Sequence, residues 1–412
     1  MTSRAAGIRL RAAMSTQNQD LYQRAQAVLF QNYRTQPIAL VRGEGTYVWD
    51  ADGKRYLDFI GGIATVSVGH ANPRVREALV EQAKLLWHAS NLYVTEPQIR
   101  LAEKLTRASQ GLKRVFFCNS GTEANEAMIK LARHWHVLQG APERIEILCF
   151  HNSFHGRTMG SLAATGQPKY QQGFGPLPQG FRFLDYGNLG QLEAAVGPQT
   201  CAVLLEPVQG EAGVMSPPRG YLARVRELCT KHGALMLLDE VQTGMGRSGR
   251  LFAHQHDGVD PDAMSLAKGI AGGMPLGALM ARDELAKVFT PGTHASTFGG
   301  NPLATAAACA VMDLLQGGLL EQVQRAGGRL SQKLAALSSK TPRVQGERGL
   351  GLLRALVLSE DLAPKVVARA RDLGLLVNAI GERVVRLAPP LTVSDEEIDA
   401  AASLLGEAVA QA

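Results

Sequence analysis

From residue 114 onward the sequence alternates short, uninterrupted apolar runs with longer amphipathic stretches. Apolar runs of this length are typical of strands that are buried on both faces of a sheet. Strand–helix alternation of this kind predicts an α/β domain with a mostly parallel sheet covered by helices. The expected strands cover residues 114–118, 145–149, 201–205, 234–238 and 276–280, and the expected helices cover 123–138, 220–232 and 304–315.

After residue 315 the pattern changes, and a length of 412 residues favours more than one core. A helix over 321–338, short strands near 349–358 and 383–387, and a capping box that starts a last helix at Ser394 predict a smaller α+β domain. Two strands, 47–50 and 55–59, are expected to pack against it. The predicted organisation is a flexible tail (1–20), an N-terminal segment (21–75), a large domain (76–315) and a small domain (316–412).

The composition excludes several classes of protein. Hydrophobic residues make up 45% and charged residues 19%, as in ordinary globular chains. The net charge is +6, but Lys and Arg are scattered without interleaved aromatic residues, so we expect no nucleic-acid partner. No apolar stretch approaches the ~20 residues that span a bilayer, so no membrane association is expected.

The cysteines and the first residues bear on localisation. The five cysteines are far apart, without CxxC or zinc-type spacing, which predicts buried reduced thiols, a cytoplasmic protein and no metal. The first 14 residues contain three arginines and no acid, a weak resemblance to a targeting segment. A disordered tail, or translation that starts at Met14, explains them equally well.

Asp239 ends the apolar run 234–238, at the carboxyl end of an expected central strand. Ligands of open α/β sheets bind at that edge. Most lone aspartates in such a place cap a strand end or a surface turn. The polar residues Glu240, Gln242 and Thr243 follow at once, and this favours a site.

Lys268 lies between the apolar residues 263–267 and the glycine-containing segment 269–273. Most lysines are solvated surface charges. A lysine in these surroundings loses solvation, which lowers the pKa of its ammonium and makes the amine a nucleophile.

Residues 120–126 (SGTEANE) follow an expected strand and open an expected helix, where backbone N–H groups can bind phosphate. An ordinary serine N-cap explains the segment equally well by itself. A phosphate seat, a strand-end carboxylate and a desolvated lysine are together the groups that pyridoxal 5′-phosphate (PLP) needs.

Residues 244–249 match GxGxxG, but five residues separate them from the strand and no helix pattern follows, so we reject a dinucleotide site.

Longer motifs carry a resemblance to a known family. They are residues 238–244 (LDEVQTG), 265–269 (SLAKG) and 297–306 (TFGGNPLATA). Lys268, in the second motif, lies 29 residues after Asp239, in the first. From about 47 to 391 the chain resembles the class III aminotransferases of PLP fold type I, and within them the acetylornithine aminotransferases. The resemblance implies a PLP enzyme with a large domain built on a mixed, mostly parallel sheet and a smaller α+β domain.

The resemblance also implies how the cofactor is held. Lys268 would bind PLP covalently, and Asp239 would face the pyridine nitrogen. Ser120, Gly121 and Thr122 would bind the phosphate. Two further residues would complete the cofactor site: Phe154, in residues 153–158 (SFHGRT), would stack on the ring, and Gln242 would lie near its phenolic oxygen.

Substrate and partner residues follow from the same resemblance. Arg157 would hold a substrate carboxylate and Arg386 the α-carboxylate of glutamate, and Glu211 would cover Arg386 when the other substrate binds. Forked, permanently charged donors suit dicarboxylates. Ser296 would lie near the substrate, and Thr297 would reach the phosphate in the other subunit of a homodimer.

The expected reaction moves the terminal amino group of N-acetylornithine to 2-oxoglutarate. Residues 62–68 (GIATVSV) differ from the Ala-Val-Asn type that the family favours, and His155 is shared with several subfamilies. Ornithine, succinylornithine, 4-aminobutyrate and lysine-pathway aminotransferases, and a more distant glutamate-semialdehyde aminomutase, therefore remain open. A regulator would need an added DNA-binding domain, and a pseudoenzyme would be expected to lack Lys268 or Asp239.

Overall fold

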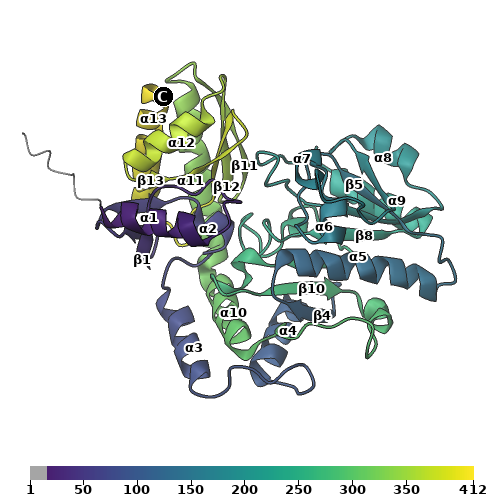
Figure 1. Ribbon diagram of the computed structural model, residues 1–412. Helices are drawn as coiled ribbons and strands as arrows, with labels where there is room; N and C mark the ends of the chain where they lie inside the picture. The colour runs from purple at the N-terminus through teal and green to yellow at the C-terminus, as the bar shows by residue number, and fades with distance from the viewer. Residues whose placement is uncertain (1–15) are drawn as a thin grey trace, which may run out of the picture.

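The computed structural model describes residues 16–412 and divides into a large lobe and a smaller lobe (Figure 1). The targeting-like residues 1–14 and the alternative start at Met14 lie outside the described residues. The tail that we expected over residues 1–20 is helical from Gln17 onward, because α1 (Gln17–Val28) begins there with Thr16 as its N-cap.

The large lobe contains a seven-stranded sheet in the order β4-β10-β9-β8-β7-β5-β6. The pairs of β10 with β4 and with β9 are antiparallel and all the other pairs are parallel, so the mixed, mostly parallel sheet is confirmed. The strands β6 and β9 were not expected from the sequence. The strands are β4 (Arg114–Cys118), β5 (Glu146–Phe150), β6 (Phe181–Leu184), β7 (Thr200–Leu205), β8 (Leu235–Asp239), β9 (Ala263–Leu266) and β10 (Gly277–Ala281).

Alternate residues of the central strands pack into two separate cores, one on each face of the sheet. In β5, Leu148 and Phe150 belong to the core that includes α9, whereas Ile147 and Cys149 belong to the core that includes α5. This is why the strands read as continuous apolar runs. The helices of this lobe are α4 (Glu96–Ala108), α5 (Gly121–Leu138), α6 (Met159–Ala164), α7 (Pro168–Gln171), α8 (Leu189–Ala195) and α9 (Tyr221–His232), with short 3₁₀ turns η1 (Ala253–His256), η2 (Lys268–Ala271) and η3 (Asp283–Val288).

The smaller lobe packs α11 (Leu320–Ser338), α12 (Ala363–Asp372) and α13 (Asp395–Gln411) against a four-stranded sheet in the order β11-β12-β15-β14. The expected capping box at Ser394 is present: its hydroxyl accepts from the Glu397 amide, and the Glu397 carboxylate accepts from the Ser394 amide. The strands are β11 (Val344–Leu350), β12 (Leu353–Leu358), β14 (Asn378–Ile380) and β15 (Val384–Leu387).

The N-terminal segment packs on the smaller lobe. Its strands β1 (Leu40–Glu44), β2 (Tyr47–Asp50) and β3 (Arg55–Asp58) are completed by β13 (Leu375–Leu376), which pairs with β3 in parallel. The short helix α2 (Gly61–Ala64) follows. The chain then descends through α3 (Pro73–Ala83) to the lower part of the molecule in Figure 1.

One long helical unit joins the two lobes. Helix α10 (Pro302–Leu314) continues through a π-helical turn, Leu315–Leu319, into α11, and the predicted domain boundary at 315/316 falls in this turn. Within residues 16–412, Pro302–Ser338 is the one helix long and apolar enough to cross a membrane. More than half of its most apolar window is buried inside the protein, as in the core helix of a folded domain.

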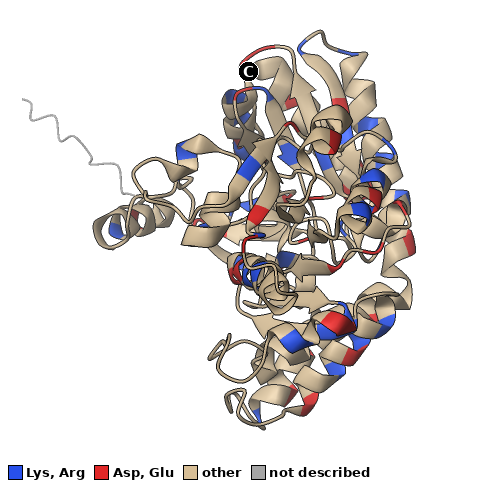
Figure 2. Cartoon of the chain, turned by 90° about the vertical axis from the view of Figure 1, so that its right-hand side faces the viewer, with Lys and Arg blue, Asp and Glu red and all other residues tan. Residues whose placement is uncertain are grey.

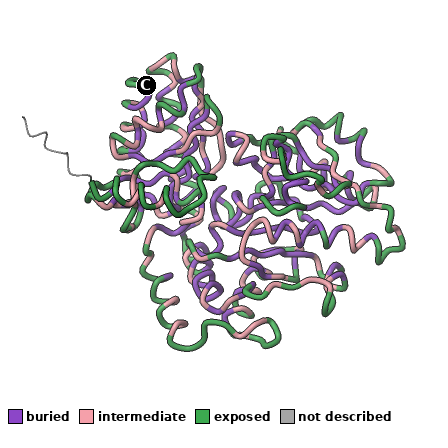
Figure 3. The backbone as a smooth tube through the Cα atoms, in the orientation of Figure 1, coloured by how far each residue is buried: buried purple, intermediate pink, exposed green. Residues whose placement is uncertain are grey.

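Burial and charge follow the expected pattern. Buried residues concentrate in the large sheet and around α10, whereas the segment after α3 is largely exposed (Figure 3). All five cysteines are buried and unpaired. Lys and Arg are interspersed with Asp and Glu over the face in Figure 2. Residues 244–249 form turns that lead to η1, with no α-helix, so they lack the context of a dinucleotide site.

Candidate active site

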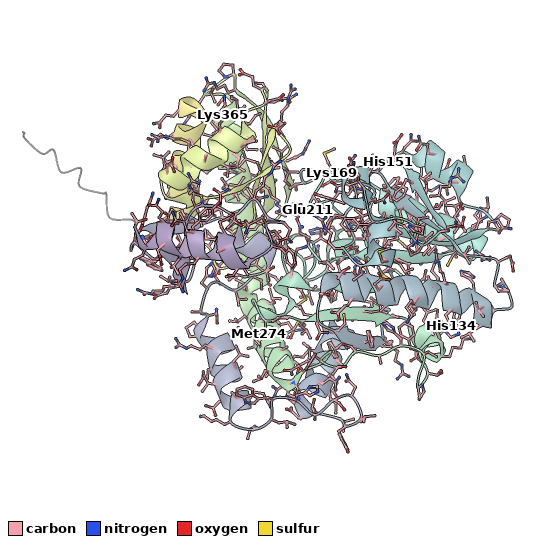
Figure 4. All side chains as sticks on the ribbon, in the orientation of Figure 1. His134, His151, Lys169, Glu211, Met274 and Lys365 are labelled. Atoms are coloured by element: carbon pink, nitrogen blue, oxygen red, sulfur yellow. The ribbon has the colours of Figure 1, made fainter. Side chains whose placement is uncertain are left out.

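A cavity of about 420 Å³ lies at the carboxyl ends of β7 and β8 and the N-terminus of α5. Glu211, one of its lining residues, lies between the two lobes in Figure 4. The cavity brings together nine of the twelve residues predicted from the sequence. These are Ser120, Gly121, Thr122, Phe154, Arg157, Glu211, Asp239, Gln242 and Lys268.

Asp239 is the last residue of β8 and is only 3% exposed. One carboxylate oxygen, Oδ1, accepts from the Val241 amide at 3.0 Å and from the Ser265 hydroxyl at 3.4 Å. The other, Oδ2, accepts from Asn125 Nδ2 at 2.8 Å and lies 2.8 Å from His155 Nδ1. Several donors therefore fix one buried carboxylate at the cavity wall.

Lys268 follows β9 and has φ of 44°, a backbone conformation that non-glycine residues rarely adopt. Burial lowers the pKa of its ammonium, although Glu211 and Asp239 act in the opposite direction. The amine therefore loses its proton more readily than a surface lysine does, and it is available as a nucleophile or a base.

The N-terminus of α5 forms another wall of the cavity. Ser120 is its N-cap and accepts from the Glu123 amide at 3.3 Å. The first amides of a helix lack intrahelical partners, so they and the helix dipole favour an anion here. The Thr122 hydroxyl lies 2.8 Å from that of Thr158 and accepts from the Arg157 amide at 3.2 Å.

The turn 153–158 is pressed against this helix end. Gly156 has φ of 140°, and a Cβ atom there would lie 2.2 Å from the Thr122 hydroxyl oxygen. Phe154 from the same turn reaches the cavity, and the exposed guanidinium of Arg157 lies 5.4 Å from its ring and 3.9 Å from that of Tyr170. The turn therefore places an aromatic face and a cation at one side of the cavity.

Arg386, on β15, is 2% exposed and reaches across from the smaller lobe. Its Nη1 donates to Glu211 Oε1 at 2.5 Å and to Gln242 Oε1 at 3.1 Å, and its Nε donates to Asn378 at 3.1 Å. Burial alone would raise the pKa of Glu211, but Arg386 and Lys268 hold it below its usual value. A carboxylate thus covers a buried guanidinium.

Ser296 and Thr297 do not line this cavity. Ser296 is connected to it indirectly, because its hydroxyl accepts from the side-chain amide of Asn119, a lining residue, at 3.2 Å. Thr297 is exposed and lines a separate hollow with residues of the 88–98 segment. This chain alone therefore leaves Thr297 away from its own cavity.

Sequence reasoning missed three buried polar residues of the cavity wall: Asn125, His155 and Glu206. Asn125 and His155 lie inside motifs that were already singled out, but their contacts with Asp239 span 114 and 84 residues along the chain. Glu206 follows β7 directly, the strand beside β8. The rule that identified Asp239, a carboxylate at a strand end, could have found it.

Comparisons with known proteins agree with this geometry. Residues 29–409 match the family model for class III aminotransferases. Acetylornithine aminotransferase from Myxococcus xanthus is 49% identical over 393 residues, which cover 95% of this chain and 98% of that protein. The chain therefore belongs to the class III aminotransferases and is a transaminase.

Two solved structures share the fold. Ornithine aminotransferase from Toxoplasma gondii ME49 superimposes with a TM-score of 0.92 at 34% identity and covers 97% of this chain and 96% of that one. N-acetylornithine aminotransferase from Stenotrophomonas maltophilia K279a has a TM-score of 0.82 at 38% identity, with 94% and 98% covered. Fold type I, expected from the sequence, is confirmed.

Proposed function

We propose that this chain uses PLP to move the terminal amino group of N-acetylornithine to 2-oxoglutarate, giving N-acetylglutamate 5-semialdehyde and glutamate. The observation that carries the proposal is one cavity that combines a lysine amine, a fixed carboxylate, a helix N-terminus and Glu211, the carboxylate that covers Arg386. Relatives named for acetylornithine, 49% identical to the chain, support the choice of donor.

The residues present fit PLP. The cofactor needs an amine for its aldehyde, an anion seat for its phosphate and a carboxylate for its ring nitrogen, and Lys268, the start of α5 and Asp239 supply these on one cavity. Among residues 16–412, His155 Nε2, on the cavity wall, is a buried polar atom without a hydrogen-bond partner. When bound, PLP acts as an electron sink for the bond-breaking at the amino carbon.

The chain's own residues would then act as follows. Lys268 would move a proton at the carbon that bears the amino group, as base and then acid. Asp239, held by His155 and Asn125, presents a preorganised negative charge to the ring nitrogen. Phe154 would pack on the ring, Gln242 would lie near its phenolic oxygen, and Ser120, Gly121 and Thr122 would seat the phosphate.

The two arginines would distinguish the two substrates. Arg157 binds the α-carboxylate of the acylated donor while Glu211 covers Arg386. Glutamate and 2-oxoglutarate carry two carboxylates, and their α-carboxylate would take the place of Glu211 on Arg386. The pairing of Glu211 with a buried guanidinium supports this exchange, because an uncovered, unpaired charge there would be costly.

We also propose a homodimer with shared sites. Leu85, Trp87 and Leu92 are largely exposed, Leu92 by 87%, and Phe298 lies beside this segment, with its ring 5.1 Å from that of His88. Exposed apolar patches of this kind mark protein interfaces. Thr297 precedes Phe298 in the chain. An interface at this apolar patch would bring Thr297 and Ser296 to the partner's cavity.

The test is a donor panel on the purified holoenzyme with 2-oxoglutarate as acceptor. We expect kcat/KM for N-acetylornithine to exceed that for ornithine, succinylornithine and 4-aminobutyrate by about a hundredfold, roughly 2.7 kcal/mol at the transition state. Comparable values for several acylated amines would indicate a broader acyl-diamino-acid aminotransferase. Activity only on ornithine or 4-aminobutyrate would reject N-acetylornithine as the donor.

A further inference from the structure

Glu206 is a buried carboxylate of the cavity wall to which the mechanism above gives no role. It follows the last residue of β7, is only 5% exposed and lies next to β8, the strand that ends in Asp239. A carboxylate is rarely buried this deeply unless it is paired or hydrogen-bonded, so its contacts indicate what it does.

Its two oxygens hold two different segments of the site. Oε1 accepts from the backbone amide of Phe154 at 3.0 Å, and Oε2 accepts from the backbone amide of Gly210 at 3.2 Å. Phe154 lies in the turn 153–158, which also carries Arg157, and Gly210 immediately precedes Glu211. One carboxylate therefore fixes the aromatic and cationic side of the cavity together with the residue that covers Arg386.

The Gly210 segment has little room to move independently. A Cβ atom on Gly210 would lie 2.0 Å from Gln242 Oε1, and this oxygen accepts from Arg386 while Gln242 Nε2 donates to Glu211 at 3.3 Å. The Tyr186 hydroxyl donates to the backbone carbonyl of Glu206 at 2.7 Å and so fixes the backbone of Glu206 as well. A shift of Gly210 would therefore be passed directly to the pair of Glu211 and Arg386.

We propose that ionised Glu206 is a positioning residue that holds Arg157 and the Glu211–Arg386 pair in their positions on the two sides of the cavity. Its protonation therefore slows the donor half-reaction more than the glutamate half-reaction. The inference rests on the proposed function, in which the donor needs Arg157 and a covered Arg386. Glutamate displaces Glu211 from Arg386, so a loosened Glu211 does not impede it.

The charge on Glu206 changes in an accessible pH range. Burial raises its pKa to about 7; His155 lowers it, Asp239 raises it, and the amides of Phe154 and Gly210 lower it. Lys268 and Tyr186 also interact with it electrostatically. Because the pKa is raised, the carboxylate takes up a proton as the pH falls through 7, and the oxygen that carries the proton becomes a poorer acceptor for its amide.

The experiment measures the two half-reactions separately in single turnovers of the holoenzyme, with N-acetylornithine and with glutamate, between about pH 6 and about pH 8.5. In the wild type, the ratio of donor to glutamate rate constants should fall about tenfold toward low pH, the scale of one hydrogen bond to a charged group. In Glu206→Gln the ratio should be low and independent of pH. Glu206→Asp should recover part of the pH dependence.

A binding measurement adds a readout that requires no turnover. Glutarate, a dicarboxylate without an amino group, should bind the wild-type holoenzyme more tightly as the pH falls, because Glu211 is loosened, and should bind Glu206→Gln with little dependence on pH. Glu193→Gln is the matched control, since Glu193 pairs with Arg224 on the surface, and it should behave as the wild type does.

The proposal is overturned if Glu206→Gln slows both half-reactions equally and leaves the pH dependence of glutarate binding unchanged. If that variant does not fold, the wild type decides: a ratio that does not change with pH is the contrary result. Failure of the wild type to use N-acetylornithine at any pH would instead reject the proposed donor, and glutarate binding would still test the role of Glu206.

Discussion

At the scale of single residues, the site depends on the contrast between Lys268 and Asp239. Both lie on the same cavity, but Asp239 is held by four donors whereas the Lys268 amine is destabilised as an ammonium by burial. A stabilising group needs a fixed charge, and a proton-transferring group needs a readily deprotonated amine.

Replacing the charge of Asp239 tests this division. Asp239→Asn keeps the size but places an amide where His155 and Asn125 donate, so we expect kcat to fall by about 10² to 10³ and PLP to bind more weakly. Steady-state kinetics and a PLP titration measure both effects. Ser265→Ala removes only the 3.4 Å bond to the same carboxylate and should cost less than tenfold. Equal losses in the two variants would contradict the charge as the cause.

At the scale of elements, the phosphate seat depends on how closely the turn 153–158 approaches α5. Gly156→Ala would place a methyl group 2.2 Å from the Thr122 hydroxyl oxygen, so we expect PLP affinity to fall tenfold or more. Gly140→Ala, just beyond the far end of α5, has a positive φ but open space around it. It should cost about 1 kcal/mol of stability without weakening PLP. Equal PLP affinity in the two variants would argue against a phosphate seat at the N-terminus of α5.

The capping box of α13 is an element whose contribution can be isolated. Ser394→Ala removes the acceptor for the Glu397 amide, so we expect the free energy of unfolding to fall by about 1 kcal/mol. Denaturant unfolding measures the loss. Activity should be unchanged, because the helix lies in the smaller lobe and contributes no residue to the cavity wall.

At the scale of the whole molecule, shared sites predict that two differently defective subunits complement one another. Lys268→Ala removes the amine, and Thr297→Ala removes the proposed partner contact with the phosphate. In a mixed dimer, one site combines an intact Lys268 with the other subunit's intact Thr297. Heterodimers that are co-expressed and purified by two tags should therefore bind PLP at that site as tightly as the wild type does. The activity expected is up to half that of the wild type. Heterodimers that still need the high PLP concentration of the Thr297→Ala homodimer would show that each chain completes its own site.

The sequence predicted most of the large sheet, because the period and length of an apolar run depend on burial alone. It missed β6 and β9, which have four residues each, too few to establish a pattern. Asp239 was predictable from its place after a strand, whereas the pairing of Glu211 with Arg386 joins residues 175 positions apart. Only the resemblance indicated that pair, and only the structure brought Asn125, His155 and Glu206 to the same wall, because such contacts leave no local pattern.

The most direct single measurement is to reduce the PLP-loaded protein with borohydride and locate the adduct by peptide mass spectrometry. We predict one pyridoxyl adduct, on the peptide that contains Lys268, and none in Lys268→Ala treated in the same way. An adduct on another lysine, or one that persists in Lys268→Ala, would contradict the assignment of this cavity as the transamination site.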